Sequence, residues 1–343
     1  MHPMRRRGLE AALGVLAVVA LGPVAAQAFV LLNELKVKGS EQVELYNSGP
    51  GPVDVNGWTI QGNDAHVIAG APLISPGGYL IVNVAGDIFD DQGGFVELLD
   101  GVVPEDAVSY GRLGSAPLPP ESTSLVAAPV SLARAPDGSF YGAPPTPSPG
   151  TDGLIWTLDL TPTFGAVNDA PAPALGGAIV LNEVDPKPVG GSDEVELYNP
   201  LAAGTSVVGW FLCNGSAFTT LSGLVPAGGF LTVTTDPGFD VEDNDLLYLF
   251  RDDGVRVDQL GFHLPPVRSS APTLDVCQCF ERFPDGAGPN LGYNWFTSGG
   301  NVTLFALECT PGSSNAFEED CGPTSVSAPP FRSWGRIKSD WFR

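Results

Sequence analysis

Short segments of this chain alternate apolar and polar residues with the period of a β-strand. Residues 80–84 read Leu-Ile-Val-Asn-Val, and residues 231–234 read Leu-Thr-Val-Thr. Because successive side chains of a strand point to opposite faces, the alternation predicts strands that bury one face in a core. Asp252-Asp253-Gly254 lies between two apolar segments, and an Asp-Gly pair tolerates the positive φ that a tight hairpin turn requires. Since no amphipathic helix follows the N-terminal segment, the pattern predicts an all-β protein.

The pattern recurs along the chain at a nearly constant offset. Residues 41–47 read Glu-Gln-Val-Glu-Leu-Tyr-Asn, and residues 193–199 read Asp-Glu-Val-Glu-Leu-Tyr-Asn. Arg-Ala-Pro-Asp-Gly at residues 134–138 likewise returns as Arg-Phe-Pro-Asp-Gly at residues 282–286. The offsets of these two pairs are 152 and 148. So steady a spacing indicates two copies of a whole domain rather than a short repeat.

The repeat divides the chain into segments of different character. The first copy is expected at residues 29–168 and the second at residues 177–315. Between them, residues 169–176 alternate proline with small residues, which predicts a short, semi-stiff linker. Residues 316–343 are expected to form a flexible C-terminal tail with a basic and aromatic end.

Residues 1–28 have the pattern of an export signal. Three consecutive arginines precede an apolar run from Ala11 to Leu21, and Ala26-Gln27-Ala28 offers small residues for cleavage. A retained anchor is the alternative, but this apolar run is shorter than the roughly 20 residues of a spanning helix. We therefore expect a secreted or envelope-associated protein without a transmembrane anchor after cleavage.

One series of short motifs occurs in the same order in both copies. It consists of Leu-Asn-Glu, Val-Glu-Leu-Tyr-Asn, Gly-Trp, a Gly-Gly-aromatic-Leu turn, Asp-Gly and a final Thr-Pro with Asn. In this order the motifs resemble the lamin tail domain. The resemblance implies two tandem immunoglobulin-like β-sandwich domains of the type found in bacterial secreted proteins. It does not carry a function, because function depends on sites rather than on the fold.

The repeated Val-Glu-Leu-Tyr-Asn motif predicts a half-buried strand. Val43 and Leu45 should face the core, Glu44 and Tyr46 should face water, and Asn47 should close the strand by bonding its own turn. A catalytic carboxylate needs a partner and a perturbed environment, and the motif offers neither. We therefore assign no catalytic residue and expect a protein that is not an enzyme.

The net charge and the absence of catalytic motifs reduce the number of function classes that fit the sequence. The chain has 16 basic and 39 acidic residues and a formal net charge of −23. Since phosphate backbones repel such a chain, no nucleic-acid partner is expected. After residue 28 the only histidines are His66 and His263, which occupy different places in the two copies, and no phosphate-binding or hydrolase motif is present.

All five cysteines lie in the second copy or just after it: Cys213, Cys277, Cys279, Cys309 and Cys321. Export would permit disulfides. Because Cys277 and Cys279 are too close along one strand to bond each other easily, we expect one of them to bond Cys213. Cys309 would then bond Cys321. The remaining thiol is either buried or forms an intermolecular link.

Acidic residues crowd one hairpin of the second copy, and four of them could bind a cation: Asp243, Asp245, Asp252 and Asp253. Calcium is the candidate, since it takes carboxylate and carbonyl oxygens. The spacing does not follow the twelve-residue calcium loop, and Asp is also ordinary in solvated turns. Both interpretations stay open.

The C-terminal tail interleaves basic and aromatic residues, and six of them are candidates for partner binding: Arg332, Trp334, Arg336, Lys338, Trp341 and Arg343. Arg and Trp dominate the energetics of many interfaces, so the tail is expected to be a sorting or docking segment. The alternative is an added strand or a frayed end.

These observations favour a secreted, non-catalytic β-sandwich protein that acts as a binding, adhesion or envelope-associated module. Its partner would be a protein, a polysaccharide or a component of the cell envelope. One alternative is a secreted hydrolase or metal-dependent enzyme with a site in its loops, and another is a purely structural spacer. An exposed apolar patch or a polar-lined cleft would favour binding or catalysis over the spacer.

Overall fold

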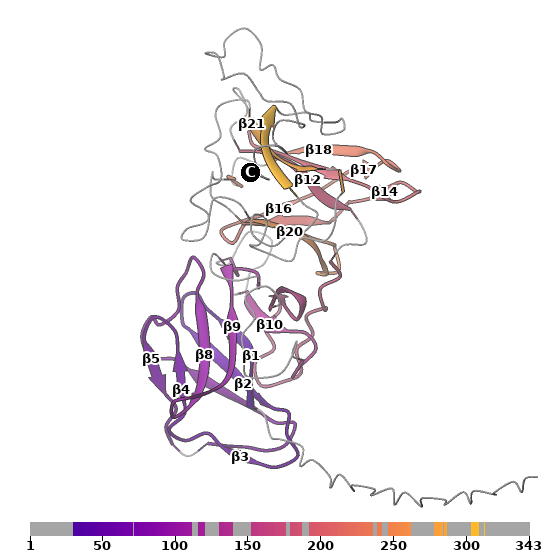
Figure 1. Ribbon diagram of the computed structural model, residues 1–343. Coiled ribbons are helices and arrows are strands. Elements are labelled where there is room, and N and C mark those ends of the chain that lie inside the picture. The colour runs from indigo at the N-terminus through magenta and orange to yellow at the C-terminus, as the bar shows by residue number, and fades with distance from the viewer. Residues whose placement is uncertain are drawn as a thin grey trace, which may run out of the picture.

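The computed structural model confirms the prediction of an all-β protein (Figure 1). It describes residues 30–70, 72–111, 116–120, 130–139, 152–175, 179–186, 192–235, 239–241, 246–261, 278–283, 285–286, 303–308 and 312. Within these ranges the regular structure is β-strand, and the one helical turn is a 3-10 turn at Asp152–Leu154. We refer to the described residues up to 175 as the first half and to those from 179 as the second half.

The first half contains eleven strands. In chain order they are β1 (Val30–Lys36), β2 (Gln42–Asn47), β3 (Val53–Asp54), β4 (Thr59–Gln61), β5 (Ala65–Val67), β6 (Leu73–Ile74), β7 (Tyr79–Asn83), β8 (Phe95–Asp100), β9 (Val103–Ser109), β10 (Ser131–Arg134) and β11 (Trp156–Asp159).

The described part of the second half contains eleven more. They are β12 (Val180–Asp185), β13 (Glu194–Tyr198), β14 (Thr205–Ser206), β15 (Phe211–Cys213), β16 (Phe218–Thr220), β17 (Leu224–Val225), β18 (Phe230–Thr234), β19 (Leu246–Phe250), β20 (Arg256–Gly261), β21 (Gln278–Phe283) and β22 (Thr303–Glu308).

The two halves have the same strand order. The first half forms a five-stranded sheet β11-β10-β1-β2-β7, a four-stranded sheet β5-β4-β8-β9 and a two-stranded sheet β3-β6. The second half forms the matching sheets β22-β21-β12-β13-β18, β16-β15-β19-β20 and β14-β17. All the named pairings are antiparallel, and the register shifts in β1 and in β12 at the corresponding place. The sequence repeat is therefore also a repeat of topology.

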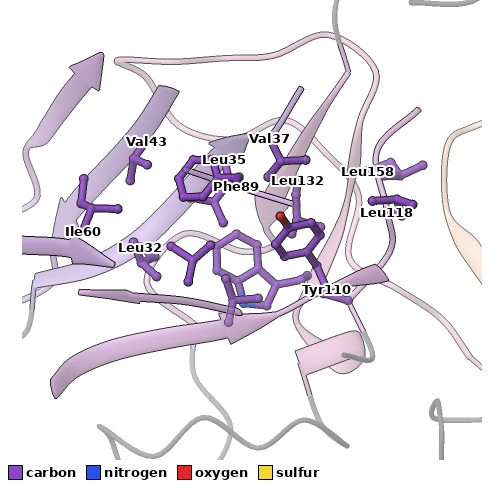
Figure 2. Packing of buried hydrophobic residues seen from close by; sticks show 14 of the residues in the cluster. Leu32, Leu35, Val37, Val43, Ile60, Phe89, Tyr110, Leu118, Leu132 and Leu158 are labelled. Carbon is purple, nitrogen blue, oxygen red and sulfur yellow. The ribbon is translucent and has the colours of Figure 1, made fainter. Parts of the chain in front are cut away.

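Apolar side chains from the two larger sheets of the first half pack face to face (Figure 2). Leu32, Leu35 and Val43 come from the five-stranded sheet, and Ile60 and Val96 come from the four-stranded sheet. All five are fully buried. Each such side chain contributes about 1.5–3 kcal/mol when it leaves water, which makes this layer the main source of stability.

The second half has a separate core of the same kind. Leu181, Val195 and Leu197 from β12 and β13 pack with Leu212 and Leu249 from β15 and β19. Their positions alternate along each strand, as the sequence pattern predicts.

The opposite face of β15 and β19 belongs to the core of the first half. Phe211 and Cys213 on β15, and Leu246, Tyr248 and Phe250 on β19, are buried in the cluster that also contains the first-half core. These two strands are thus covered on both faces, which explains why β19 is an unbroken apolar run. In Figure 1, β16 and β20 lie on the side of the second half that faces the first.

The corresponding strands of the first half carry both polar and apolar residues on that outer face, where Phe95 and Leu99 lie beside Glu97 on β8. The pairs Phe211–Phe250 and Cys213–Tyr248 occupy the same register as Thr59–Leu99 and Gln61–Glu97. The outer face of β4 and β8 is partly exposed, whereas that of β15 and β19 is buried. The difference between the copies at these positions therefore follows from what covers each sheet.

Candidate functional site

Four carboxylates on the outer face of the first five-stranded sheet hold one segment of the chain, residues 161–168. They are Glu34 on β1, Glu44 on β2, Asp159 at the end of β11 and Asp137 in the turn after β10. We call this arrangement the carboxylate clamp and residues 161–168 the return segment. Because the carboxylates come from four separate places in the sequence, only the folded sheet brings them together.

At the start of the return segment, the clamp accepts hydrogen bonds from two backbone amides. The Thr161 N–H donates to Asp159 Oδ1 at 2.8 Å, and the Thr163 N–H donates to Glu34 Oε1 at 3.2 Å. The Ser131 hydroxyl donates to the same Glu34 oxygen at 2.5 Å. The other oxygen, Glu34 Oε2, is buried and accepts no hydrogen bond.

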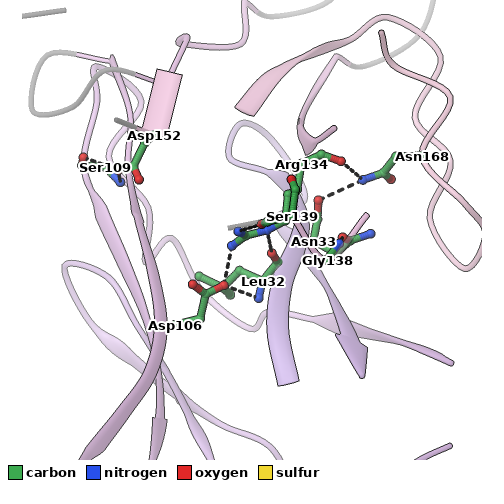
Figure 3. A network of polar contacts seen from close by, with 9 residues as sticks. All are labelled: Leu32, Asn33, Asp106, Ser109, Arg134, Gly138, Ser139, Asp152 and Asn168. Atoms are coloured by element: carbon green, nitrogen blue, oxygen red, sulfur yellow. Dashed lines mark hydrogen bonds and ion pairs between the residues drawn. The ribbon is translucent and has the colours of Figure 1, made fainter. Parts of the chain in front are cut away.

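The clamp continues along the rest of the segment. The Gly165 N–H donates to Glu44 Oε2, and the Asn168 N–H donates to Asp137 Oδ1 at 3.1 Å. The Asn168 side chain also donates to the backbone carbonyl of Arg134 at 2.9 Å (Figure 3). The carboxylates thus accept hydrogen bonds from backbone N–H groups that have no strand partner. Buried backbone N–H groups usually require such an acceptor.

A second set of side chains fixes the clamp itself. Asn33 Nδ2 donates to Glu44 Oε1 at 2.9 Å and to Asp137 Oδ1 at 3.1 Å. The Tyr79 hydroxyl donates to Asp137 Oδ2 at 2.5 Å. These bonds link β1, β2 and β7 to the turn after β10 and hold the carboxylates in one orientation.

Beneath the clamp, between the two sheets, lies a buried ion pair (Figure 3). Arg134 Nη2 and Asp106 Oδ2 are 2.5 Å apart, and the Leu32 N–H donates to the same oxygen at 2.8 Å. Arg134 Nε donates to the Leu32 carbonyl at 2.7 Å, and its guanidinium lies 4.7 Å from the ring centroid of Trp156. The pair therefore joins β9, β10 and β1 inside the sandwich.

The same polar framework occurs in the second half. Arg282 pairs with Asp258 at 2.6 Å, and the Leu181 N–H donates to that Asp258 oxygen at 2.8 Å. Asn182 Nδ2 donates to Glu196 at 2.9 Å, and the Gly312 N–H donates to Glu196 at 2.6 Å. Both the ion pair and part of the clamp were thus retained with the repeat.

Burial makes the clamp carboxyl groups weaker acids than exposed carboxyl groups. It raises the pKa of Glu34 to about 8, and the nearby charges of Asp159 and Glu44 add to the effect. Burial likewise raises the pKa of Glu44, and it raises the pKa of Glu196 in the second half to about 7. Among the described residues, none of the ion pairs involves a clamp carboxylate.

The structure corrects one expectation for the repeated motif and bears out another. Glu44 was expected to face water, yet it is fully buried because the return segment covers it. Asn47 closes its own turn as expected: its side-chain amide donates to the carbonyls of Gly51 and Ile74 at 2.8 Å each, and its oxygen accepts the Gly49 N–H.

The expected calcium ligands lie only partly within the described residues. Asp252 and Asp253 sit in the turn between β19 and β20, whereas Asp243 and Asp245 fall outside the described ranges. Asp253 pairs with Arg251 in an exposed position, and the hydrogen bond from Arg251 lowers the pKa of Asp253. In the part of the chain that the structure describes, no group of three or more metal-binding side chains is placed to hold an ion.

The expected disulfide between Cys213 and Cys277 or Cys279 is wrong. Cys213 is a buried thiol at the contact between the halves, and the Gly215 N–H donates to its sulfur at 3.5 Å. Its side chain points out of the second sandwich, because it lies on the face of β15 opposite Leu212. Cys279 is buried and disulfide-bonded. Cys277, Cys309 and Cys321 lie outside the described residues.

The six tail residues expected to bind a partner, from Arg332 to Arg343, also lie outside the described ranges.

The sequence did not predict two features of the structure. The first is the clamp, which depends on contacts between residues more than 100 positions apart. The second is the junction between the halves, whose one sequence signal was the apolar run of β19. Within the described ranges, none of the elements is a helix with the length and hydropathy that crossing a membrane requires.

Side chains at the junction bond directly across it. The Leu118 N–H donates to the Tyr248 hydroxyl at 3.2 Å, and Lys38 Nζ donates to the Gly215 carbonyl at 2.9 Å. Arg256, which is fully buried, donates to the Gly153 carbonyl and, at 3.1 Å, to that of Trp156. Burial lowers the pKa of Arg256 to about 10, so it remains a cation at neutral pH.

Comparison with protein-family models, with curated proteins and with solved structures finds no match for this chain.

Proposed function

We propose that this chain is an exported, non-catalytic binding or adhesion module of the cell envelope, in which two β-sandwiches act as one rigid body. The lamin-tail resemblance and the docking role of the C-terminal tail form part of this proposal. The partner would be a protein, a polysaccharide or another envelope component. The observation that carries the proposal is the junction between the halves.

The junction supports rigidity because it combines apolar burial with directional bonds. Phe211, Tyr248 and Phe250 are buried there, and the rings of Phe211 and Phe250 stack with centroids 4.9 Å apart. Three such side chains contribute roughly 5–9 kcal/mol when they leave water, at 1.5–3 kcal/mol each. A linked pair of domains loses little further freedom on docking, so a contact of this size favours one fixed arrangement.

The use of the carboxylates supports a non-catalytic role. Glu34 Oε1 and both oxygens of Glu44 accept hydrogen bonds from backbone amides and neighbouring side chains, and both carboxylates are buried under the return segment. A general acid or base needs access to a substrate proton at hydrogen-bond distance, which a covered carboxylate lacks. No arrangement among the described residues favours the hydrolase or metal-dependent alternative.

A pair of matched substitutions tests the rigid body. Tyr248→Lys places a charge in the junction, whereas Glu97→Lys places the same residue at the corresponding position of the first half, which is partly exposed. Small-angle X-ray scattering should give a larger radius of gyration for Tyr248→Lys alone. If the junction variant scatters like the control, the halves are not held by this contact.

Fractionation of cells tests the envelope role. The native protein should be retained with the envelope, and a version whose basic and aromatic residues within 331–343 are replaced by Ser and Gly should be released. If both proteins are recovered free in the medium with no partner, the binding role is wrong. In that case a rigid spacer would be the remaining function.

A further inference from the structure

We propose that the carboxylate clamp is a pH-dependent latch: ionisation of Glu34 releases the return segment from the outer face of the first five-stranded sheet. This inference does not depend on the proposed function. It depends on the geometry of the clamp, in which one segment is held mainly through carboxylate acceptors.

Glu34 is the group in the clamp least able to carry a charge. It is fully buried, one of its oxygens accepts no hydrogen bond, and the other is shared by Ser131 and Thr163. An ionised carboxylate with a buried, unsatisfied oxygen costs several kcal/mol, so the neutral form is favoured while the latch is closed.

The charged groups around Glu34 oppose its ionisation. Glu44 faces it from β2 and Asp159 faces it from β11. Ser131 on β10 and Thr163 in the return segment contribute only neutral hydrogen-bond donors. A second negative charge among these carboxylates therefore repels its neighbours at short range.

Further charged groups lie around these carboxylates. Asp137 lies beside Glu44, and its carboxylate accepts a hydrogen bond from Tyr79 on β7. Asp169 lies beside Asp159. Lys36 is the cation on the same strand as Glu34, and it donates to Ser40 at 2.7 Å rather than to the clamp. Among the described residues, no cation thus offsets the ionisation of Glu34.

Release would change the surface of the sheet. The return segment covers Glu44 and packs over Ile81, since a Cβ on Gly165 would lie 3.3 Å from Ile81 Cδ1. Opening would expose Glu44 on this outer face of β2 and would remove the contact with Ile81 on β7, whose side chain is already 40% exposed. The second half has a related contact between Glu196 and Gly312.

The direction of the pH effect follows from linkage. The pKa of Glu34 is about 8 when the latch is closed, and that of an exposed Glu is about 4.3. The closed form therefore holds one more proton between these values, and opening becomes more favourable as the pH rises. One proton sets an upper limit of about tenfold per pH unit, so we expect roughly a 10- to 100-fold rise in the opening constant between about pH 6 and pH 8.

Hydrogen exchange measured by mass spectrometry tests the latch. Peptides covering residues 160–169 of the full chain should lose protection over this range, after correction for the intrinsic pH dependence of exchange. Glu34→Gln keeps the shape of the side chain without a titrating proton, and it should reduce the change to about threefold or less. Glu97→Gln, on an outer face of the other sheet, should retain the full change.

Two results would overturn the proposal: a constant protection of the return segment in the native protein, or a full pH response that persists in Glu34→Gln. If Glu34→Gln does not fold, carboxyl ¹³C NMR of the native protein decides the matter. A titration midpoint of Glu34 near 8 supports the latch, and a midpoint near 4.3, as in an exposed Glu, refutes it.

Discussion

Removal of the Asp106 carboxylate should destabilise the first half more than any exposed acidic substitution. Asp106 lies 2.5 Å from Arg134 and also accepts the Leu32 N–H. Breaking a buried ion pair costs about 3–5 kcal/mol, because the remaining charge stays in a medium of low polarity. The unsatisfied amide of Leu32 adds about 1–3 kcal/mol. We therefore expect Asp106→Ala to lower the free energy of unfolding by about 4 kcal/mol or more.

Urea unfolding followed by tryptophan fluorescence measures this loss. Trp156 is a local reporter because the Arg134 guanidinium lies over its ring. Asp100→Ala, in an exposed position on the neighbouring strand β8, is the control and should cost less than about 0.5 kcal/mol. Asp258→Ala should give a loss similar to that of Asp106→Ala, since the second half has the same ion pair.

A double variant separates the ion pair from the packing around it. Asp106→Leu with Arg134→Met replaces both charges by apolar groups of similar size, and such replacements are often neutral or stabilising. The double variant should therefore recover the part of the loss that comes from the unpaired guanidinium, but not the part that comes from the Leu32 amide. A loss of less than about 1 kcal/mol for Asp106→Ala would refute the reasoning, since an uncompensated buried guanidinium cannot be that favourable.

Three further predictions concern the junction, the turns and pH. Gly215→Ala should cost at least 1 kcal/mol more than Gly57→Ala in thermal unfolding: both glycines have positive φ, but a Cβ at 215 would lie 2.6 Å from Leu118 and one at 57 meets nothing. Asn199→Ala should lower the free energy of unfolding by about 2 kcal/mol, because its side-chain amide satisfies two backbone carbonyls. Stability should fall as the pH rises from about 5 to about 8, since the raised pKa of Glu34 means that the folded chain holds more protons than the unfolded one. Calorimetric melting temperatures in that range would check the last point, and an increase with pH would contradict it.

Much of the fold could be predicted from the spacing of apolar residues. Residues 80–84 lie in and just after β7, and residues 231–234 lie in β18. The Asp-Gly turn also lies where the sequence places it, with Gly254 at a φ of 79° between two paired strands. These features are local, so a period of two and one turn signal are enough to specify them.

The clamp could not be predicted, because a period of two assigns a side chain to a face but does not say what covers that face. Glu44 lies on the face opposite Val43 and Leu45, and the pattern therefore placed it in water. The return segment that buries it is 121 positions away. Such a contact depends on how β11 leads back across the sheet, which neither the propensity nor the spacing of the motif determines.

The junction depends on one difference between two halves that otherwise share the same framework. Both halves keep the buried ion pair and the strand order, yet they differ on the outer face of the four-stranded sheet. Phe211, Tyr248 and Phe250 on β15 and β19 are buried against the first half, whereas the matching face of the first half mixes polar and apolar residues and is partly exposed. The difference in burial between the two matching faces therefore comes from what covers each one: the first half covers the face of β15 and β19.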